Sequence, residues 1–208
     1  MRMMMFALVI AANLCAAPPE TRLDPAETIA IHGGKATFAV STNTLGINVR
    51  GTSGSLDGRV EMHRVASGLV LDRLDVRLPV KTLTTGMSLR DEHMRKLVFT
   101  KPGGDAPDLR FDAAGVSCAG VAPGRPAACQ INGMLAIRDI ARNLSVGVKI
   151  HQDGETFRID GDGTVNLHDY GIEQPSQLGV KTANEVQIHL ELTAKPVVSN
   201  TARVGAQR

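Results

Sequence analysis

The sequence predicts an all-β protein of about eight long antiparallel strands, and three observations support this class. Apolar and polar residues alternate with a period of two over most of the chain. Clusters of Gly and Pro separate the alternating stretches. No segment shows the helical periodicity, over roughly 10 to 15 residues, that the crossovers of a parallel sheet require. Long strands with one buried face must close into a barrel or pack as two sheets.

The predicted strands follow one another along the chain, and in each of them the apolar residues keep a single parity. They lie around residues 38–40, 47–49, 60–62, 74–80, 109–111, 131–137, 144–150, 157–167 and 186–192. The parity changes between Leu71 and Leu74, and again between Phe111 and Val116. A slip by one residue turns every later side chain to the other face unless an extra residue bulges out. We therefore expect a β-bulge at both places.

The segment 84–99, TTGMSLRDEHMRKLVF, interrupts the alternation and predicts a short helix. Ser88 followed by Asp91 forms a capping-box-like start. Met94 and Leu97 are three residues apart and share one side of a helix. We expect that side to dock on the barrel, at its mouth, and the opposite side to carry the polar residues.

The polar residues of this helix have two interpretations, an active site and a lid. His93 beside carboxylates is a plausible general acid or base. The chain has no G-x-S-x-G nucleophile motif and no glycine spacing of a phosphate loop, however, so chemistry lacks support. Arg90 and Asp91 are expected to tie the helix to neighbouring loops through charge-assisted hydrogen bonds. We predict a lid that includes Arg90, Asp91, His93 and Met94, with contact to a ligand head group as the alternative.

Cys118 and Cys129 flank a Gly- and Pro-rich loop, AGVAPGRPAA, and each adjoins a strand-like run. Cysteines at both stems of a hairpin can be bridged, because cross-strand Cβ atoms lie ~4.5–5.5 Å apart. The pattern therefore predicts a disulfide in an exported protein, with two unpaired buried thiols as the alternative. A redox-active pair is not indicated, since no C-x-x-C motif exists.

The first residues have the layout of a secretory signal. Arg2 precedes an apolar run over residues 3–14, and small residues follow, so we expect cleavage after Ala17. The run of about 12 apolar residues is shorter than the ~20 needed to span a bilayer, and no later segment comes close. We predict a cleaved signal peptide over residues 1–17, a binding domain over 18–195, a frayed tail over 196–208, and a periplasmic or secreted mature protein.

Composition and spacing exclude several classes of function. The chain has 208 residues, a net charge of +2, one Tyr and no Trp, which argues against a nucleic-acid partner. The six His residues show no spacing that would place two imidazoles on one metal. Asp160, Asp162 and Asp169 lack the glycine position and closing Glu of an EF-hand and are predicted to be polar strand residues. We expect no metal and no cofactor. Arg138 and Asp139, next to Arg142, either pair with Arg90 and Asp91 or are solvated.

Four motifs of this chain resemble, in their order and spacing, those of the YceI-like polyisoprenoid-binding family. They are TGMSLRDEHMRKLVF (85–99), PDLRFDA (107–113), GMLAIRDIARNLSVGV (133–148) and HDYGIEQP (168–175). The resemblance runs from about Phe38 to Ala194. It implies a lipocalin-like antiparallel β-barrel in the bacterial periplasm, with an elongated lumen for a long isoprenoid or similar amphiphilic lipid. Glu27, Leu167 and Asp139 stand where the family usually has His, Arg and Gly, which bears on ligand identity and head-group contacts rather than on the fold.

The strand parity assigns a set of apolar residues to the inner face, where a ligand would bind. They are Phe38, Val40, Val76, Leu78, Phe111, Leu135, Ile137, Val146, Val148, Ile159, Val165, Ile188 and Leu190. We predict a carrier, not an enzyme, that holds a polyisoprenoid, an isoprenoid quinone or a similar lipid there. The alternatives are a module with a filled core that acts through a surface partner, and an enzyme at the mouth that uses His93 or His168. A homodimer remains open.

Overall fold

The computed structural model describes residues 24–177 and 179–197, which form ten strands and three short helical segments. The predicted signal peptide and nearly all of the predicted tail lie outside these residues. The strands are β1 (Glu27–Thr42), β2 (Asn48–Ser53), β3 (Asp57–Val65), β4 (Gly68–Leu78), β5 (Leu109–Ala119), β6 (Ala127–Ile137), β7 (Ile140–Asp153), β8 (Thr156–Asn166), β9 (Ser176–Gln177) and β10 (Val180–Pro196). The helical segments are η1 (Val80–Thr82), α1 (Ser88–Met94) followed directly by η2 (Arg95–Phe99), and η3 (Leu167–Tyr170).

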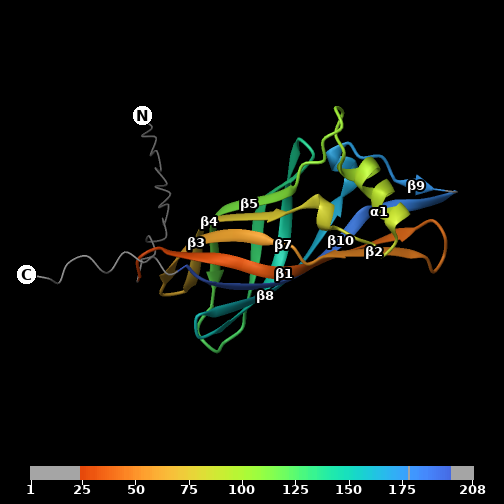
Figure 1. Ribbon diagram of the computed structural model, residues 1–208. Coiled ribbons are helices and arrows are strands. Elements are labelled where there is room, and N and C mark those ends of the chain that lie inside the picture. Colours follow the sequence, from red (N-terminus) through yellow and green to blue (C-terminus); the bar gives the residue numbers. More distant parts are fainter. Residues whose placement is uncertain (1–23, 178, 198–208) are drawn as a thin grey trace, which may run out of the picture.

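Eight of the strands close into an antiparallel barrel, so the predicted fold class is confirmed (Figure 1). The order is β1-β3-β4-β5-β6-β7-β8-β10, and β10 pairs back onto β1 from Ile29↔Pro196 to Thr42↔Thr182. Closure removes the unpaired edges that an open sheet would present to solvent. Among the described residues, no helix is long and apolar enough to cross a lipid bilayer.

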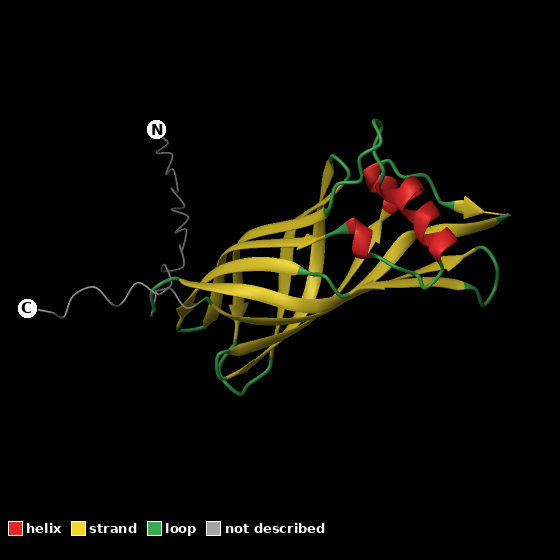
Figure 2. Cartoon of the chain, viewed as in Figure 1, coloured by secondary structure: helices red, strands yellow, loops and turns green. Residues whose placement is uncertain are grey.

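The second half of β1 extends one end of the barrel. Residues Glu27–His32 pair with β3, and residues Ala36–Ser41 pair with β2. Gly33, with a φ of 78°, lies in the irregular step between these halves, where the left-handed backbone favours glycine. The β1–β2 hairpin and the β9–β10 pair project beyond the other strands at the end that carries α1 (Figures 1 and 2). We call this end the mouth.

The two predicted changes of parity lie at one level of the barrel. Glu61 pairs with Arg73 and Met62 pairs with Leu71, so Asp72 is the extra residue of a bulge on β4, as predicted. At the second place β5 and β4 keep one register throughout, whereas the β5–β6 register runs only from Arg110↔Ala136 to Asp112↔Met134 and is interrupted beyond it. β5 changes face at Gly115, whose φ of 64° is left-handed, directly opposite the β4 bulge. Since both strands turn together, their mutual pairing is preserved.

Cys118 on β5 and Cys129 on β6 form the predicted disulfide, with a Cα–Cα distance of 5.1 Å. Closing so short a loop restricts the unfolded chain and is worth roughly 3 kcal/mol in the chain-entropy model. We expect the Cys118→Ala/Cys129→Ala variant to unfold with a free energy about 2–3 kcal/mol lower than that of the oxidised protein. Urea denaturation with and without reductant measures this difference. Identical midpoints, or thiols that alkylate without reductant, would contradict the bridge.

The outer wall carries a pair of facing carboxylates, Asp75 on β4 and Asp112 on β5. Burial raises the pKa of Asp112, the hydrogen bond and charge of Asp75 raise it further, and Arg73 and Arg110 act against the rise. A carboxyl group whose pKa is raised in the folded state lowers the free energy of unfolding when it is ionised. This loss disappears as the pH falls through the folded pKa toward the unfolded pKa.

We therefore expect Asp112→Asn to raise the free energy of unfolding at neutral pH. The side chain is exposed, so solvent screening should keep the gain below about 1 kcal/mol. Urea denaturation of both proteins at neutral pH and near pH ~4 tests this, because the gain should shrink in acid. Asp153→Asn, at the exposed last residue of β7, serves as control. A gain that grows in acid would show that the carboxylate pair is not the cause.

Candidate ligand-binding cavity

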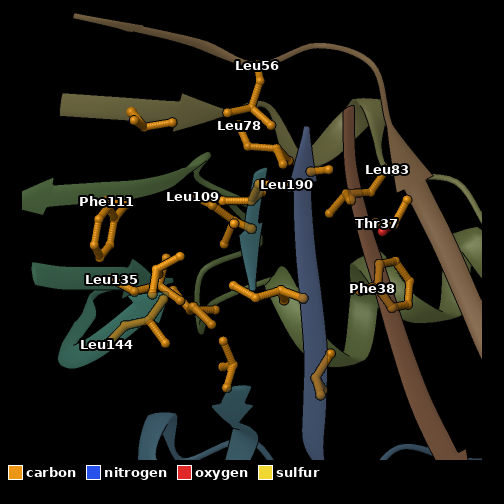
Figure 3. A pocket seen from close by; sticks show the side chains of 18 of the residues that line it. Thr37, Phe38, Leu56, Leu78, Leu83, Leu109, Phe111, Leu135, Leu144 and Leu190 are labelled. Atoms are coloured by element: carbon orange, nitrogen blue, oxygen red, sulfur yellow. The ribbon is translucent and has the colours of Figure 1, made fainter. Parts of the chain in front are cut away.

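The barrel encloses an apolar cavity of about 730 Å³ that extends to the mouth. This volume falls within the ~300–1,000 Å³ of typical small-molecule sites. All thirteen residues that strand parity assigns to the inner face line it. Figure 3 shows the side chains of Phe111, Leu135 and Leu190 reaching into the space from three different strands. The walls are almost wholly aliphatic and aromatic, so the cavity suits a molecule with a long apolar part.

Two phenylalanines of the wall lie against glycines on neighbouring strands. Phe38 pairs with Gly51, and a Cβ at Gly51 would collide with the Phe38 ring and lie 2.8 Å from the Thr84 carbonyl oxygen. A Cβ at Gly133 would lie 2.6 Å from Phe111 Cζ and 2.5 Å from a backbone oxygen. The two rings therefore occupy space that a side chain at either glycine would need.

The lining set also includes residues that parity could not identify. Leu56 lies between β2 and β3, and Leu83 follows η1; both are buried and both face the cavity (Figure 3). Neither belongs to a regular strand, so no alternation marks them. The lid contributes further wall from Met87, Leu89 and other residues of α1 and η2. Part of the cavity is therefore closed by irregular chain.

Asp91 is the polar anchor of the lid. Its side chain is 5% exposed, and its carboxylate accepts hydrogen bonds from Thr84 Oγ1 at 2.6 Å, from the Thr85 backbone N–H at 2.6 Å and from the Thr85 hydroxyl. The predicted capping box is wrong: α1 begins after Met87, and no side chain caps it. Asp91 reaches back to the loop before the helix instead, because that loop folds over its first turn.

The hydrogen bonds of Asp91 set its protonation. Burial alone would raise the pKa of this carboxyl, but the donors Thr84 and Thr85 outweigh burial and, with the charge of Arg95, hold the pKa below its ordinary value. The carboxylate therefore stays ionised and hydrogen-bonded at neutral pH, which suits a structural anchor better than an acid or base.

The docked face of the lid differs in part from the prediction. Met94 and Leu97 both line the cavity as expected, but Leu97 is 44% exposed, whereas the next two residues, Val98 and Phe99, are buried. The last turn, η2, is π-helical, and the Thr100 N–H donates to the Arg95 carbonyl five residues back. The wider turn rotates the chain, so residues 98 and 99 are buried more deeply against the barrel than residue 97.

Arg138 fastens the end of the lid to the barrel. It lies in the two-residue turn between β6 and β7, where Ile137 pairs with Ile140, and it has a left-handed φ of 59°. Its Nε donates to the Val98 carbonyl at 2.9 Å, and its Nη2 donates to the Leu97 carbonyl. A guanidinium at the carboxyl end of a helix is favourable. The expected pairing with Asp91 is wrong, and the half-buried guanidinium combines its two hydrogen bonds to the lid with partial exposure to solvent.

The neighbouring charged residues also find other partners. Asp139 lies 3.3 Å from Lys101 Nζ, and Arg142 Nε donates to the Asp169 carbonyl at 3.0 Å. The expected pairing of Asp139 with Arg90 is therefore wrong, and the Asp139 side chain is 71% exposed, as in the alternative of a solvated residue.

Polar groups at the mouth include two guanidinium nitrogens that make no hydrogen bond within the described part of the chain. Arg90 lines the cavity, and its Nη2 donates to the Thr85 carbonyl at 2.7 Å. Its Nε is buried without a partner, as are Arg95 Nε and, on β10, Asn184 Oδ1. Buried polar atoms without partners are rare and costly. Of the three residues only Arg90 lines the cavity, so its Nε is the donor that a ligand oxygen in the cavity could satisfy.

The residues proposed for catalysis are not brought together. His93 lines the cavity, whereas His168 is exposed on η3 outside it. On the outer face His189 Nδ1 donates to the Asp162 carboxylate at 2.8 Å, and that hydrogen bond raises the pKa of His189 against the effect of burial. Within residues 24–177 and 179–197, no group of three or more His, Cys, Asp and Glu side chains is placed to hold a metal ion.

Comparisons with known proteins point in one direction. The family model described as the YceI-like domain matches residues 23–194. A search of curated proteins gives no significant match. Similar solved structures include a polyisoprenoid binding domain from Saccharophagus degradans, with 12% identity, a TM-score of 0.61, and 81% of this chain and 98% of that one covered.

Two further structures share this fold. BcnA from Burkholderia cenocepacia has 20% identity and a TM-score of 0.57, with 76% of this chain and 95% of that one covered. A YceI protein from Campylobacter jejuni has 17% identity and a TM-score of 0.58, with 74% and 88% covered. At these identities the likeness establishes a common fold, and the function has to be argued from the cavity itself.

Proposed function

Because the chain belongs to the YceI-like domain family, we propose that it is a carrier that holds a long-chain amphiphile, such as a polyisoprenoid or an isoprenoid quinone, in the barrel lumen. The observation that carries the proposal is the apolar cavity of about 730 Å³. One of the similar structures is described as a polyisoprenoid binding domain, which supports the ligand class. The cavity also argues against the alternative of a filled core.

The energetics of burial suit such a ligand. Moving a methylene group from water into an apolar site gains ~0.8 kcal/mol, so a tail with about ten buried carbons supplies ~8 kcal/mol before ordering costs. The wall residues of the barrel, among them Leu135, Val148 and Leu190, provide this environment without any polar contact to the tail. Such a site selects for length and slenderness rather than for a particular functional group.

The mouth supplies the polar half of the site. The unpartnered Nε atoms of Arg90 and Arg95 are donors, and both belong to the lid. A head group with acceptor oxygens, such as a phosphate or a quinone carbonyl, would satisfy the Nε of Arg90, which lines the cavity. The ligand would then lie with its tail in the lumen and its head group beneath the lid, with Arg90, His93 and Met94 around it.

Export is part of the same proposal. A bridge such as Cys118–Cys129 forms and persists in oxidising compartments, which supports a periplasmic or secreted site of action. We expect the signal peptide over residues 1–17 to be removed there. A catalytic role has less support, because Asp91 is an ionised anchor and His168 lies outside the cavity.

The test is to identify what the protein carries. Protein purified without detergent is extracted with organic solvent, and the extract is analysed by mass spectrometry. We expect an isoprenoid or another long-chain amphiphile in near-stoichiometric amount, and rebinding of a fluorescent isoprenoid after delipidation. An empty extract combined with no rebinding would refute the carrier function. Loss of a lipid-converting activity in His93→Ala, with binding retained, would favour an enzyme.

A further inference from the structure

Exposed apolar side chains concentrate at the mouth. Seven large apolar side chains are exposed in the described part of the chain, and five of them come from the β1–β2 turn and the lid. We call these five the mouth patch: Leu45, Ile47, Met87, Leu89 and Leu97. The β1–β2 turn and α1 lie at the same end of the barrel in Figures 1 and 2. Met134, by contrast, stands alone on the wall of β6.

The mouth patch is continuous with the lumen. Ile47, Met87, Leu89 and Leu97 line the cavity with one part of the side chain and are 44–57% exposed overall. Leu45 is fully exposed at the turn and does not line the cavity. Apolar surface therefore extends from the interior of the barrel out to solvent. Single exposed apolar residues are ordinary, but a gathered set around an apolar opening marks an interaction surface.

In the two segments that carry the patch, cationic residues outnumber acidic ones. Residues 43–51 and 81–100 contain five cationic and two acidic residues: Arg50, Lys81, Arg90, Arg95 and Lys96 against Asp91 and Glu92. Asp91 is buried and takes three hydrogen bonds, so Glu92 is the exposed carboxylate of these two segments. Exposed apolar residues flanked by Lys and Arg are the composition of segments that bind anionic lipid surfaces.

We propose that the mouth docks on the surface of an anionic lipid bilayer. The mouth patch enters the boundary between head groups and acyl chains, and the surrounding cations contact the anionic head groups. This builds on the proposed function: a tail that passes from a bilayer into the lumen through a docked mouth does not cross water. Docking itself, however, depends only on the patch and the charges, so it can be measured without any isoprenoid.

The experiment is flotation of delipidated protein with vesicles of phosphatidylcholine containing about 30 mol% phosphatidylglycerol, compared with vesicles of phosphatidylcholine alone. We expect wild type to bind the anionic vesicles, with a partition coefficient that falls as salt is added. Leu45→Glu should reduce this coefficient at least tenfold, and Leu45→Glu/Leu89→Glu should reduce it further. Met134→Glu introduces the same charge at an exposed apolar residue away from the mouth and should leave the partition coefficient unchanged.

Several results would overturn docking. The first is that wild type does not bind anionic vesicles. The second is that Leu45→Glu and Met134→Glu reduce the partition coefficient equally. The third is that light scattering shows a dimer that depends on the mouth patch while vesicles are not bound. Thermal melts of each variant establish that it is folded. Binding of a fluorescent isoprenoid in vesicle-free buffer separates the two proposals, because Leu45→Glu should retain it. Lumen binding without docking would refute this inference alone, and docking without lumen binding would refute the carrier function alone.

Discussion

Filling the lumen with one phenylalanine, Val148→Phe, should lower the affinity for a long isoprenoid about a hundredfold while the barrel stays folded. Val148 is buried, lines the cavity and pairs with Gly161 on β8. Because Gly161 has no side chain, the new ring has room to extend into the lumen. There it takes the space of three or four methylenes of the tail, worth ~3 kcal/mol, which is about a hundredfold in the dissociation constant.

Two companion variants make the result specific. Val76→Phe fills the lumen from another strand, again beside a glycine, since Val76 pairs with Gly58. Leu135→Met conserves volume and should bind almost as wild type does. Titration with a fluorescent isoprenoid and thermal melts of all four proteins are the measurements. Equal affinity in wild type and both filled variants, with melting temperatures preserved, would show that the ligand binds elsewhere.

Removal of the lid anchor should be the most costly single change for stability. In Asp91→Ala, the hydroxyls of Thr84 and Thr85 and one backbone N–H lose a buried carboxylate acceptor. Hydrogen bonds to charged groups are worth ~1.5–3 kcal/mol each, and part of this is recovered through water, so we expect a loss of about 3–4 kcal/mol. Glu92→Ala is the matched control, because the neighbouring carboxylate is exposed and should matter little.

The protonation state of Asp91 gives this prediction a pH dependence. Its folded pKa is lowered, so its contribution is complete above the unfolded pKa of ~3.9 and is lost as the pH falls through the folded value. In urea denaturation, the free energy of unfolding of wild type should therefore exceed that of Asp91→Ala at neutral pH, and this difference should become smaller in strong acid. A difference that does not change with pH would contradict the role of Asp91 as an ionised anchor. Equal stability of the two proteins, combined with loss of ligand turnover in Asp91→Ala, would favour a catalytic role.

The barrel and its inner face could be predicted because they follow from a local rule. In a strand, alternate side chains point to opposite faces, so Phe111 and Leu135 had to lie inside once the alternation was recognised. The rule ends where the strands end. Leu56 and Leu83 form part of the same wall, but the irregular chain around them gives no parity to read.

The contacts of the lid were harder to predict, for two different reasons. Ser88 and Asp91 have the spacing of a capping box, and nothing local reveals that Asp91 prefers the hydroxyls of the preceding loop. Arg138 meets the Leu97 carbonyl from 41 positions away, a contact that depends on where a hairpin turn falls in space. Charge patterns identify groups that need partners, but only the folded chain decides which partners they find.

The attachment of Arg138 to the last turn of the lid has a kinetic consequence. Arg138 binds the Val98 and Leu97 carbonyls but does not line the cavity, so it influences the ligand only through the ease with which the lid opens. A change that loosens this attachment speeds the entry and the exit of a ligand by the same factor, since both pass through the opened mouth. The association and dissociation rate constants then rise together, and the dissociation constant, their ratio, is nearly unchanged. For the proposed carrier we therefore expect the barrel wall to set how tightly a ligand is held, and the turn between β6 and β7 to set how fast the lid opens for its exchange.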